Sequence, residues 1–152
     1  MTDLLVKLYE LPLQAQLDPA VTVRRALAPE KRFLADWVAR EFGAGWASEL
    51  EVAFARLPLA CLVAHRGQEV LGFACYDAVA RGFFGPTGVA AAARGQGIGK
   101  ALLLATLQAM SSEGYAYAII GGAGPVEFYV RSVGAIPIPG SDPGIYRGLL
   151  RG

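Results

Sequence analysis

The residues from Arg94 to Lys100 have the types and spacing of an anion-binding loop. They read Arg-Gly-Gln-Gly-Ile-Gly-Lys, come shortly after an apolar stretch that includes Val89, and lead into an apolar helical pattern that starts at Ala101. A strand, a glycine-rich turn and a helix start, in that order, aim unpaired backbone N–H groups and the positive end of the helix dipole at one place. The stretch therefore predicts a phosphate-binding site.

Two common phosphate-binding patterns do not fit this loop. The ATP/GTP loop needs G-x-x-x-x-G-K-[ST], but Arg94 stands at its first glycine and Ala101 replaces its hydroxyl residue. The dinucleotide fingerprint needs G-x-G-x-x-G, and its last glycine falls on Lys100 or on Leu102, depending on where the pattern is started. Neither a nucleoside triphosphate nor a dinucleotide is therefore indicated.

A third pattern, Q/R-x-x-G-x-G/A, is filled by Arg94, Gly97 and Gly99. It resembles the acetyl-CoA pyrophosphate loop of the GNAT superfamily of acyl-CoA-dependent N-acetyltransferases. The plainer interpretation is a glycine-rich turn that only joins a strand to a helix. The apolar strand before the loop and the long apolar helix after it favour the resemblance.

Composition indicates one globular domain, and we expect a single unit over residues 1–152. Of its 152 residues, 54% are hydrophobic, which is enough for a sizeable core. The formal net charge is +1 and no basic tract is present, so nucleic acid is not an expected partner. No apolar run is long enough to cross a membrane, and the start of the chain lacks the pattern of a signal peptide.

Cysteine and histidine usage points away from metal chemistry. Cys61 and Cys75 each lie in an apolar, strand-like run, and we expect buried, reduced thiols in a cytoplasmic protein. His65 is the only histidine, so a zinc site and a Ser-His-Asp triad are both unexpected.

Hydrophobic periodicity and turn residues predict an alternation of strands and helices. Helices are expected from Pro29 to Gly43, from a Ser48–Glu51 capping box to Pro58, from the glycine loop to Ser112, and over 126–133. Strands are expected at residues 4–11, 21–27, 59–64, 70–76, 83–90, 115–120, near 136 and at 146–150.

From residue 21 onward this order resembles the GNAT fold. The resemblance implies a mixed α/β (α+β) fold with a central, mostly antiparallel sheet of six to seven strands, about four flanking helices, and strands that splay apart at the CoA site. Residues 1–18 are an extra N-terminal strand and connector on a core of residues 19–152. We expect that strand at a sheet edge or at a homodimer contact.

The resemblance also implies the site residues. Thr87, Gly88 and Val89 would lie along the acyl and pantetheine arm, with the Val89 N–H polarising the thioester carbonyl. Tyr129 would be the general acid near the CoA sulfur, where a neutral phenol can return a proton to a thiolate; the alternative for Tyr129 is a core aromatic. Phe128 is expected to face the core. The pyrophosphate would be bound by Arg94, Gly95, Gln96, Gly97, Ile98, Gly99 and Lys100.

The chain departs from the GNAT pattern on the acceptor side. No carboxylate lies in residues 83–87, where many GNAT enzymes carry a glutamate base, and Gly121–Gly124 occupies the place of a pantetheine-binding asparagine. Three acids elsewhere are candidates for the base, although each is also readily explained as a solvated side chain: Glu49, Asp77 and Glu127. Four aromatics are candidates for the acceptor pocket or for the core: Phe42, Trp46, Tyr76 and Tyr146.

The function that these features imply is transfer of the acetyl group of acetyl-CoA to a primary amine of a small-molecule acceptor, by direct attack in a ternary complex. Acetyl-CoA is a co-substrate, and no metal is expected. Two alternatives remain at this stage: a non-catalytic acyl-CoA-binding regulatory module, and an interaction domain with a vestigial loop.

Overall fold

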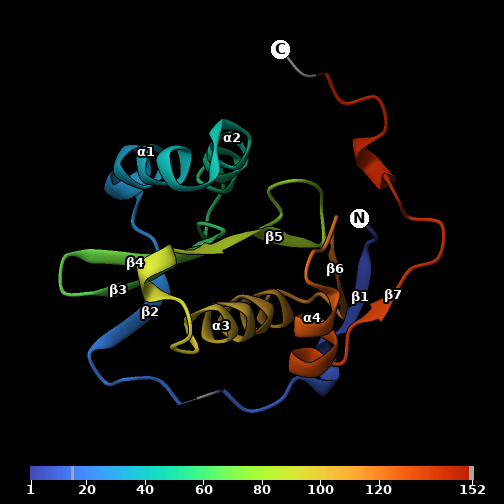
Figure 1. The fold of residues 1–152 in the computed structure, drawn as a ribbon, viewed down its shortest axis with the longest axis horizontal. Helices are drawn as coiled ribbons and strands as arrows, with labels where there is room; N and C mark the ends of the chain where they lie inside the picture. The colour runs from blue at the N-terminus through green and yellow to red at the C-terminus, as the bar shows by residue number, and fades with distance from the viewer. Residues whose placement is uncertain (15, 151–152) are drawn as a thin grey trace.

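A seven-stranded mixed sheet, in the order β2-β3-β4-β5-β6-β1-β7, forms the centre of the computed structural model, which describes residues 1–14 and 16–150 (Figure 1). Neighbouring strands are antiparallel except for the parallel pair β5–β6. The strands are β1 (Leu4–Lys7), β2 (Val21–Arg25), β3 (Cys61–Arg66), β4 (Glu69–Tyr76), β5 (Phe83–Val89), β6 (Tyr117–Ile120) and β7 (Ile136–Pro137). The predicted fold class is confirmed.

Four helices cover the two faces of the sheet. Helices α1 (Lys31–Phe42) and α2 (Ala44–Ala53) lie on one face, and α3 (Ile98–Ser112) and α4 (Val126–Val133) on the other (Figure 1). α3 is the central helix of its face, since most of its apolar residues are buried, and α4 ends at Gly134 with a left-handed φ of 66°. Four short 3-10 segments complete the described chain: Leu8–Glu10, Ala28–Glu30, Ala91–Ala93 and Gly144–Tyr146.

The predicted capping box at Ser48 and Glu51 is wrong. α2 begins at Ala44, directly after Gly43, so Ser48 lies inside the helix. Gly43 ends α1 with a φ of 111° and at once starts α2. The helix begins early because Ala47 already packs on the core, and this tertiary contact outweighs the local capping signal.

Strand β1 lies inside the sheet, so its expected position at a sheet edge is wrong, while a homodimer contact stays a prediction. It pairs with β6 through Leu4↔Ile120 and with β7 through Leu4↔Pro137. Leu4 and Val6 are fully buried, which a strand between two neighbours requires on its core-facing side.

The strand expected at residues 146–150 is also absent. β1 occupies the position beside β6, β7 ends the sheet, and the chain after Ile138 leaves it. Gly140, Gly144 and Gly148 all have left-handed φ values, which break an extended conformation. We call residues 139–150 the C-terminal arm, and Figure 1 shows it rising from β7 to the side of the sheet that carries α1 and α2.

Strands β5 and β6 separate after a short contact. They pair only at Phe83↔Ile119 and Phe84↔Ile120, after which β6 ends while β5 continues to Val89. The opposite edge of β5 stays paired with β4, through Ala74↔Thr87 and Phe73↔Gly88. One edge of β5 is therefore open beyond Phe84, as the splayed-strand prediction requires.

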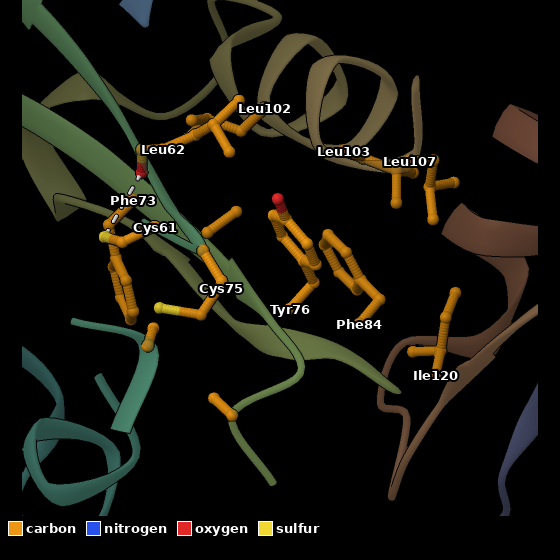
Figure 2. Close-up of a cluster of buried hydrophobic side chains, with 14 of the residues drawn as sticks. Cys61, Leu62, Phe73, Cys75, Tyr76, Phe84, Leu102, Leu103, Leu107 and Ile120 are labelled. Atoms are coloured by element: carbon orange, nitrogen blue, oxygen red, sulfur yellow. Dashed lines mark hydrogen bonds between the residues drawn. The ribbon is translucent and has the colours of Figure 1, made fainter. Parts of the chain in front are cut away.

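Buried side chains fill both faces of the sheet. In Figure 2, Tyr76 and Phe84 point toward Leu103 and Leu107 of α3, whereas Cys75 points to the other side of β4. Cys61 and Cys75 are free and buried, as expected. Within the described residues, no helix has the length and apolar character needed to cross a membrane.

Candidate functional site

A cavity of about 490 Å³ opens where β5 and β6 separate, between β5, the start of α3 and the start of α4. Its walls contain ten of the eleven residues predicted for the site, all except Gln96. The lining residues are Thr87, Gly88, Val89, Ala93, Arg94, Gly95, Gly97, Ile98, Gly99, Lys100, Leu103, Pro125, Phe128 and Tyr129.

The glycine loop leaves the start of α3 open to the cavity. Gly97 is the N-cap residue with a left-handed φ of 78°, and no side chain caps the helix. The N–H groups of the first turn are thus free to bind a ligand. A Cβ on Gly97 would approach no closer than 4.0 Å to its nearest neighbour, Leu17, and one on Gly99 would lie 3.5 Å from Val89. The glycines therefore keep space free beside the backbone.

Two cationic side chains lie at this end of the cavity. Arg94 donates a hydrogen bond from Nε to the carbonyl of Val89, at 3.4 Å, and Lys100 lies in the first turn of α3. The Gln96 side chain points elsewhere: its Oε1 accepts a hydrogen bond from Arg66 at 3.0 Å, and Gln96 lines a separate cavity of about 360 Å³. Backbone N–H groups, the helix dipole and two cations favour an anion at this end.

β5 forms a wall of the cavity and is held firmly by its neighbours. The Thr87 hydroxyl donates a hydrogen bond to the carbonyl of Phe73 on β4, at 3.0 Å. On the α1/α2 face, the ring of Phe42 covers the α-carbon of Gly88. The strand is therefore fixed in place even though one of its edges is open.

Tyr129, on α4, is the titratable phenol of the cavity. It is 7% exposed and its ring makes edge contacts with Phe84 and Phe128. Burial raises the pKa of the Tyr129 hydroxyl, so it stays protonated at neutral pH. Phe128, which was expected to face the core, is partly buried and packs against it while also lining the cavity, and Tyr129 is the more deeply buried of the two.

Four wall residues were missed by the sequence analysis: Ala93, Leu103, Pro125 and Phe128. Two of them had a usable signal. Leu103 follows Gly99 by four residues and so shares its helix face, and Phe128 is the neighbour of Tyr129. No local pattern marks Ala93 or Pro125.

The three candidate acids have different surroundings. Glu127 is exposed. Asp77 accepts hydrogen bonds from Arg56, Tyr115 and the N–H of Gly82, so its oxygens are occupied by a structural network. Glu49 is half-buried, and its one described hydrogen bond comes from the Tyr146 hydroxyl, at 3.2 Å.

The four candidate aromatics also have different surroundings. Tyr76 is fully buried, and its hydroxyl contacts Arg25 and Glu113, so it belongs to the core. Phe42 and Trp46 stack at 5.3 Å and pack on Phe73 above β4. Tyr146 lies in the C-terminal arm.

Comparison with known proteins agrees with this geometry. The sequence profile of the Acetyltransferase (GNAT) family matches residues 31–134, and the chain belongs to this family. The profile covers both helix pairs, the glycine loop and Tyr129. No curated protein sequence matches the chain.

Three solved structures illustrate the likeness of fold. A GCN5-related N-acetyltransferase from Sphaerobacter thermophilus has a TM-score of 0.72 at 19% identity, over 90% of this chain and 48% of its own. A glucosamine N-acetyltransferase region of a fungal multi-domain β-N-acetylglucosaminidase has a TM-score of 0.72 at 16% identity, over 90% and 19%. The N-acetyltransferase YhbS from Escherichia coli, in complex with CoA, has a TM-score of 0.52 at 21% identity, over 66% and 63%. The chain spans about half the length of the Sphaerobacter protein and less of the fungal one.

Metal ligands do not cluster in the described residues. Over residues 1–14 and 16–150, no group of three or more His, Cys, Asp or Glu side chains is placed to hold an ion.

Proposed function

We propose that this chain transfers the acetyl group of acetyl-CoA to the primary amine of a small molecule. The observation that carries the proposal is the cavity between the separating strands β5 and β6. It joins an anion-binding helix start at one end to a buried, protonated phenol at the other. Acetyl-CoA matches this arrangement, because it has an anionic diphosphate at one end and a thioester on a less polar arm at the other.

The walls of the cavity fit acetyl-CoA. At the loop, Arg94, Lys100 and the first-turn N–H groups would bind the pyrophosphate, and Gly97 and Gly99 leave room for its oxygens. Further in, the apolar side chains of Leu103, Pro125 and Phe128 offer a surface for the pantetheine arm. Thr87, Gly88 and Val89 would run beside this arm along the open edge of β5.

The proposed chemistry is direct attack of the amine nitrogen on the thioester carbonyl. The N–C bond forms, the C–S bond breaks, and the departing thiolate takes a proton from the Tyr129 hydroxyl. The nitrogen loses one proton as it becomes the amide, and this proton restores the Tyr129 hydroxyl through solvent. The Val89 N–H would stabilise the negative charge on the carbonyl oxygen. Burial keeps Tyr129 in the protonated form that this role requires.

Two solved relatives support the donor and the acceptor class. YhbS is solved with CoA, and the fungal region acetylates glucosamine, a small primary amine. We further propose a cytoplasmic location, where acetyl-CoA is available and the free thiols of Cys61 and Cys75 stay reduced.

The test has two measurements. CoA and acetyl-CoA at millimolar concentration should raise the melting temperature, because a ligand that binds only the folded state stabilises it. Incubation of a primary-amine library with acetyl-CoA should then yield a product 42 Da heavier, by mass spectrometry. Stabilisation by CoA without turnover of any amine would favour a non-catalytic acyl-CoA-binding module. The absence of a carboxylate in residues 83–87 is the feature that favours this alternative.

A further inference from the structure

A hydrogen bond joins Glu49 and Tyr146, which lie far apart in the sequence. The Tyr146 hydroxyl donates to Glu49 Oε2 at 3.2 Å, although 97 positions separate the two residues. Glu49 lies on α2, and Tyr146 ends the short 3-10 segment of the C-terminal arm. The arm is held by the first residues of the chain, since the Asp3 N–H donates a hydrogen bond to Ser141 Oγ at 2.8 Å and the Met1 ammonium pairs with Asp142 at 2.6 Å.

The pair extends across the separating strands on the face opposite the CoA cavity. Glu49 lies near β4. The pKa of Cys75, on β4, is raised mainly by burial and by Cys61, and the negative charge of Glu49 adds to this rise. The Tyr146 ring lies 3.9 Å from the Cβ position of Gly122, just past the end of β6. Because β5 lies between β4 and β6, the Tyr146–Glu49 hydrogen bond crosses above β5.

Open space and an aromatic side chain lie on the same face of the sheet as Glu49 and Tyr146. A Cβ on Gly85 of β5 would have no atom within 4 Å, so the space beside this part of the strand is open. Trp46 precedes Glu49 by three residues and therefore shares its side of α2. Trp46 is 38% exposed and stacks on Phe42. An aromatic face beside a carboxylate is suited to an organic cation.

The charge of Glu49 has no partner in the described protein. Over residues 1–14 and 16–150, no Lys, Arg or His nitrogen lies within 4.0 Å of its carboxylate. Burial raises the pKa of Glu49, and the hydrogen bond from Tyr146 partly offsets this rise. A half-buried carboxylate that receives one neutral donor gains more from a cation.

We propose that Glu49 and Tyr146 form the acceptor site, and that Glu49 binds the ammonium group of a primary amine and takes its proton before attack. The ammonium displaces the Tyr146 hydroxyl from Glu49 Oε2, and Trp46 covers the carbon next to the nitrogen. One proton passes from the ammonium to the carboxylate, and the free amine reaches the thioester across β5. This inference rests on the proposed acetyl transfer and adds the acceptor side to it.

The experiment measures amine binding directly by titration calorimetry, with and without saturating CoA. The probes are three amines, each matched with the alcohol that replaces its ammonium: 2-phenylethylamine, hexylamine and glucosamine, with 2-phenylethanol, hexanol and glucose. We expect at least one amine to bind more tightly than its alcohol. Glu49→Gln should weaken that amine about tenfold or more, the size of a lost charged hydrogen bond, and should leave its alcohol unchanged.

Glu51→Gln is the matched control, because Glu51 is an exposed acid on the same helix whose nearest cation, Lys31, is 3.9 Å away. It should bind the amine like the wild type, and CoA should stabilise both variants as it stabilises the wild type. The proposal is overturned if no amine is preferred over its alcohol, or if Glu49→Gln binds the amine as tightly as Glu51→Gln. A missing CoA stabilisation together with Glu49-dependent amine binding would instead overturn the proposed function and leave the amine site standing.

Discussion

The ring of Phe42 lies against the α-carbon of Gly88, so closely that a Cβ there would be 2.5 Å from Phe42 Cζ. This contact joins the end of α1 to the strand that walls the cavity. The ring cannot easily withdraw, because it packs against Trp37, Trp46 and Phe73 with centroid separations between 5.3 and 5.7 Å. The absence of a side chain at residue 88 therefore sets how closely α1 approaches β5.

Gly88→Ala should lower the free energy of unfolding by about 1–3 kcal/mol, the usual cost of an added methyl in a packed core. Urea unfolding without ligand measures it. Gly45→Ala is the control: Gly45 lies in α2 with nothing within 4 Å of its Cβ position, so it should be neutral or slightly stabilising. Equal stability of the two variants would show that the aromatic cluster yields to the methyl.

Gly97 and Gly99 should respond differently to alanine although both line the cavity. Gly97→Ala places a side chain at a φ of 78° and should cost about 1 kcal/mol of stability without ligand. Gly99 is helical, and its added Cβ would make an ordinary 3.5 Å contact, so Gly99→Ala should unfold like the wild type. Thermal unfolding of the free proteins makes this comparison.

The same two variants test the anion site. Both should lose most of the stabilisation that CoA gives the wild type, because each methyl occupies space beside the first-turn N–H groups of α3. A shift in Gly99→Ala equal to that of the wild type would contradict pyrophosphate binding at this loop.

Leu4→Ala should show that β1 is structurally essential. Leu4 is fully buried between β6 and β7, so its truncation should cost about 2–5 kcal/mol. Leu13→Ala, at a side chain 94% exposed, should leave stability unchanged. Chemical unfolding of both variants is the measurement. A loss of less than about 1 kcal/mol in Leu4→Ala would indicate that the protein does not depend on β1 for its stability.

This strand also shows where sequence reasoning stops. The existence of β1 could be predicted from its alternating apolar residues, as could β4, β5, α4 and the end of α3, because turn residues and periodicity are local. Which strand fills the position beside β6 depends on competition between the N-terminal strand and residues 146–150, and no local pattern reports that competition. The Ser48 capping signal failed for a related reason: packing of Ala47 extends α2 backwards.

The parts of the candidate site that are contiguous in the sequence could be predicted, and the parts that come from distant segments could not. The loop from Arg94 to Lys100 carries its own signal, and the structure brings six of its seven residues to the cavity together with Tyr129. Tyr129 is more deeply buried than Phe128, and its edge contact with the distant Phe84 could not be predicted from the sequence of α4. Glu49 and Tyr146 were each among the candidates from the sequence, but their contact joins distant segments and could not be predicted from a local pattern.

Tyr129→Phe should separate chemistry from binding. The ring contacts with Phe84 and Phe128 remain, so stabilisation by CoA should match the wild type. Turnover of a responsive amine should fall about 100-fold, in the range expected for loss of a general acid. Tyr9→Phe, which changes an exposed phenol paired with Tyr117, is the control and should keep full turnover. Unchanged turnover in Tyr129→Phe would remove the acid role.

Tyr146→Phe should shift the pH dependence of amine binding. Burial is the main cause that raises the pKa of Glu49, and the Tyr146 hydrogen bond opposes it. Without the hydroxyl, the pKa of Glu49 therefore rises further. Because only the carboxylate binds an ammonium, binding is lost as the pH falls through this pKa, so the midpoint of the loss should move to higher pH. Calorimetric titrations with the responsive amine between about pH 4 and pH 8 measure the midpoint. Tyr9→Phe should leave it in place, and a midpoint that stays fixed or moves to lower pH in Tyr146→Phe would show that Glu49 does not hold the amine.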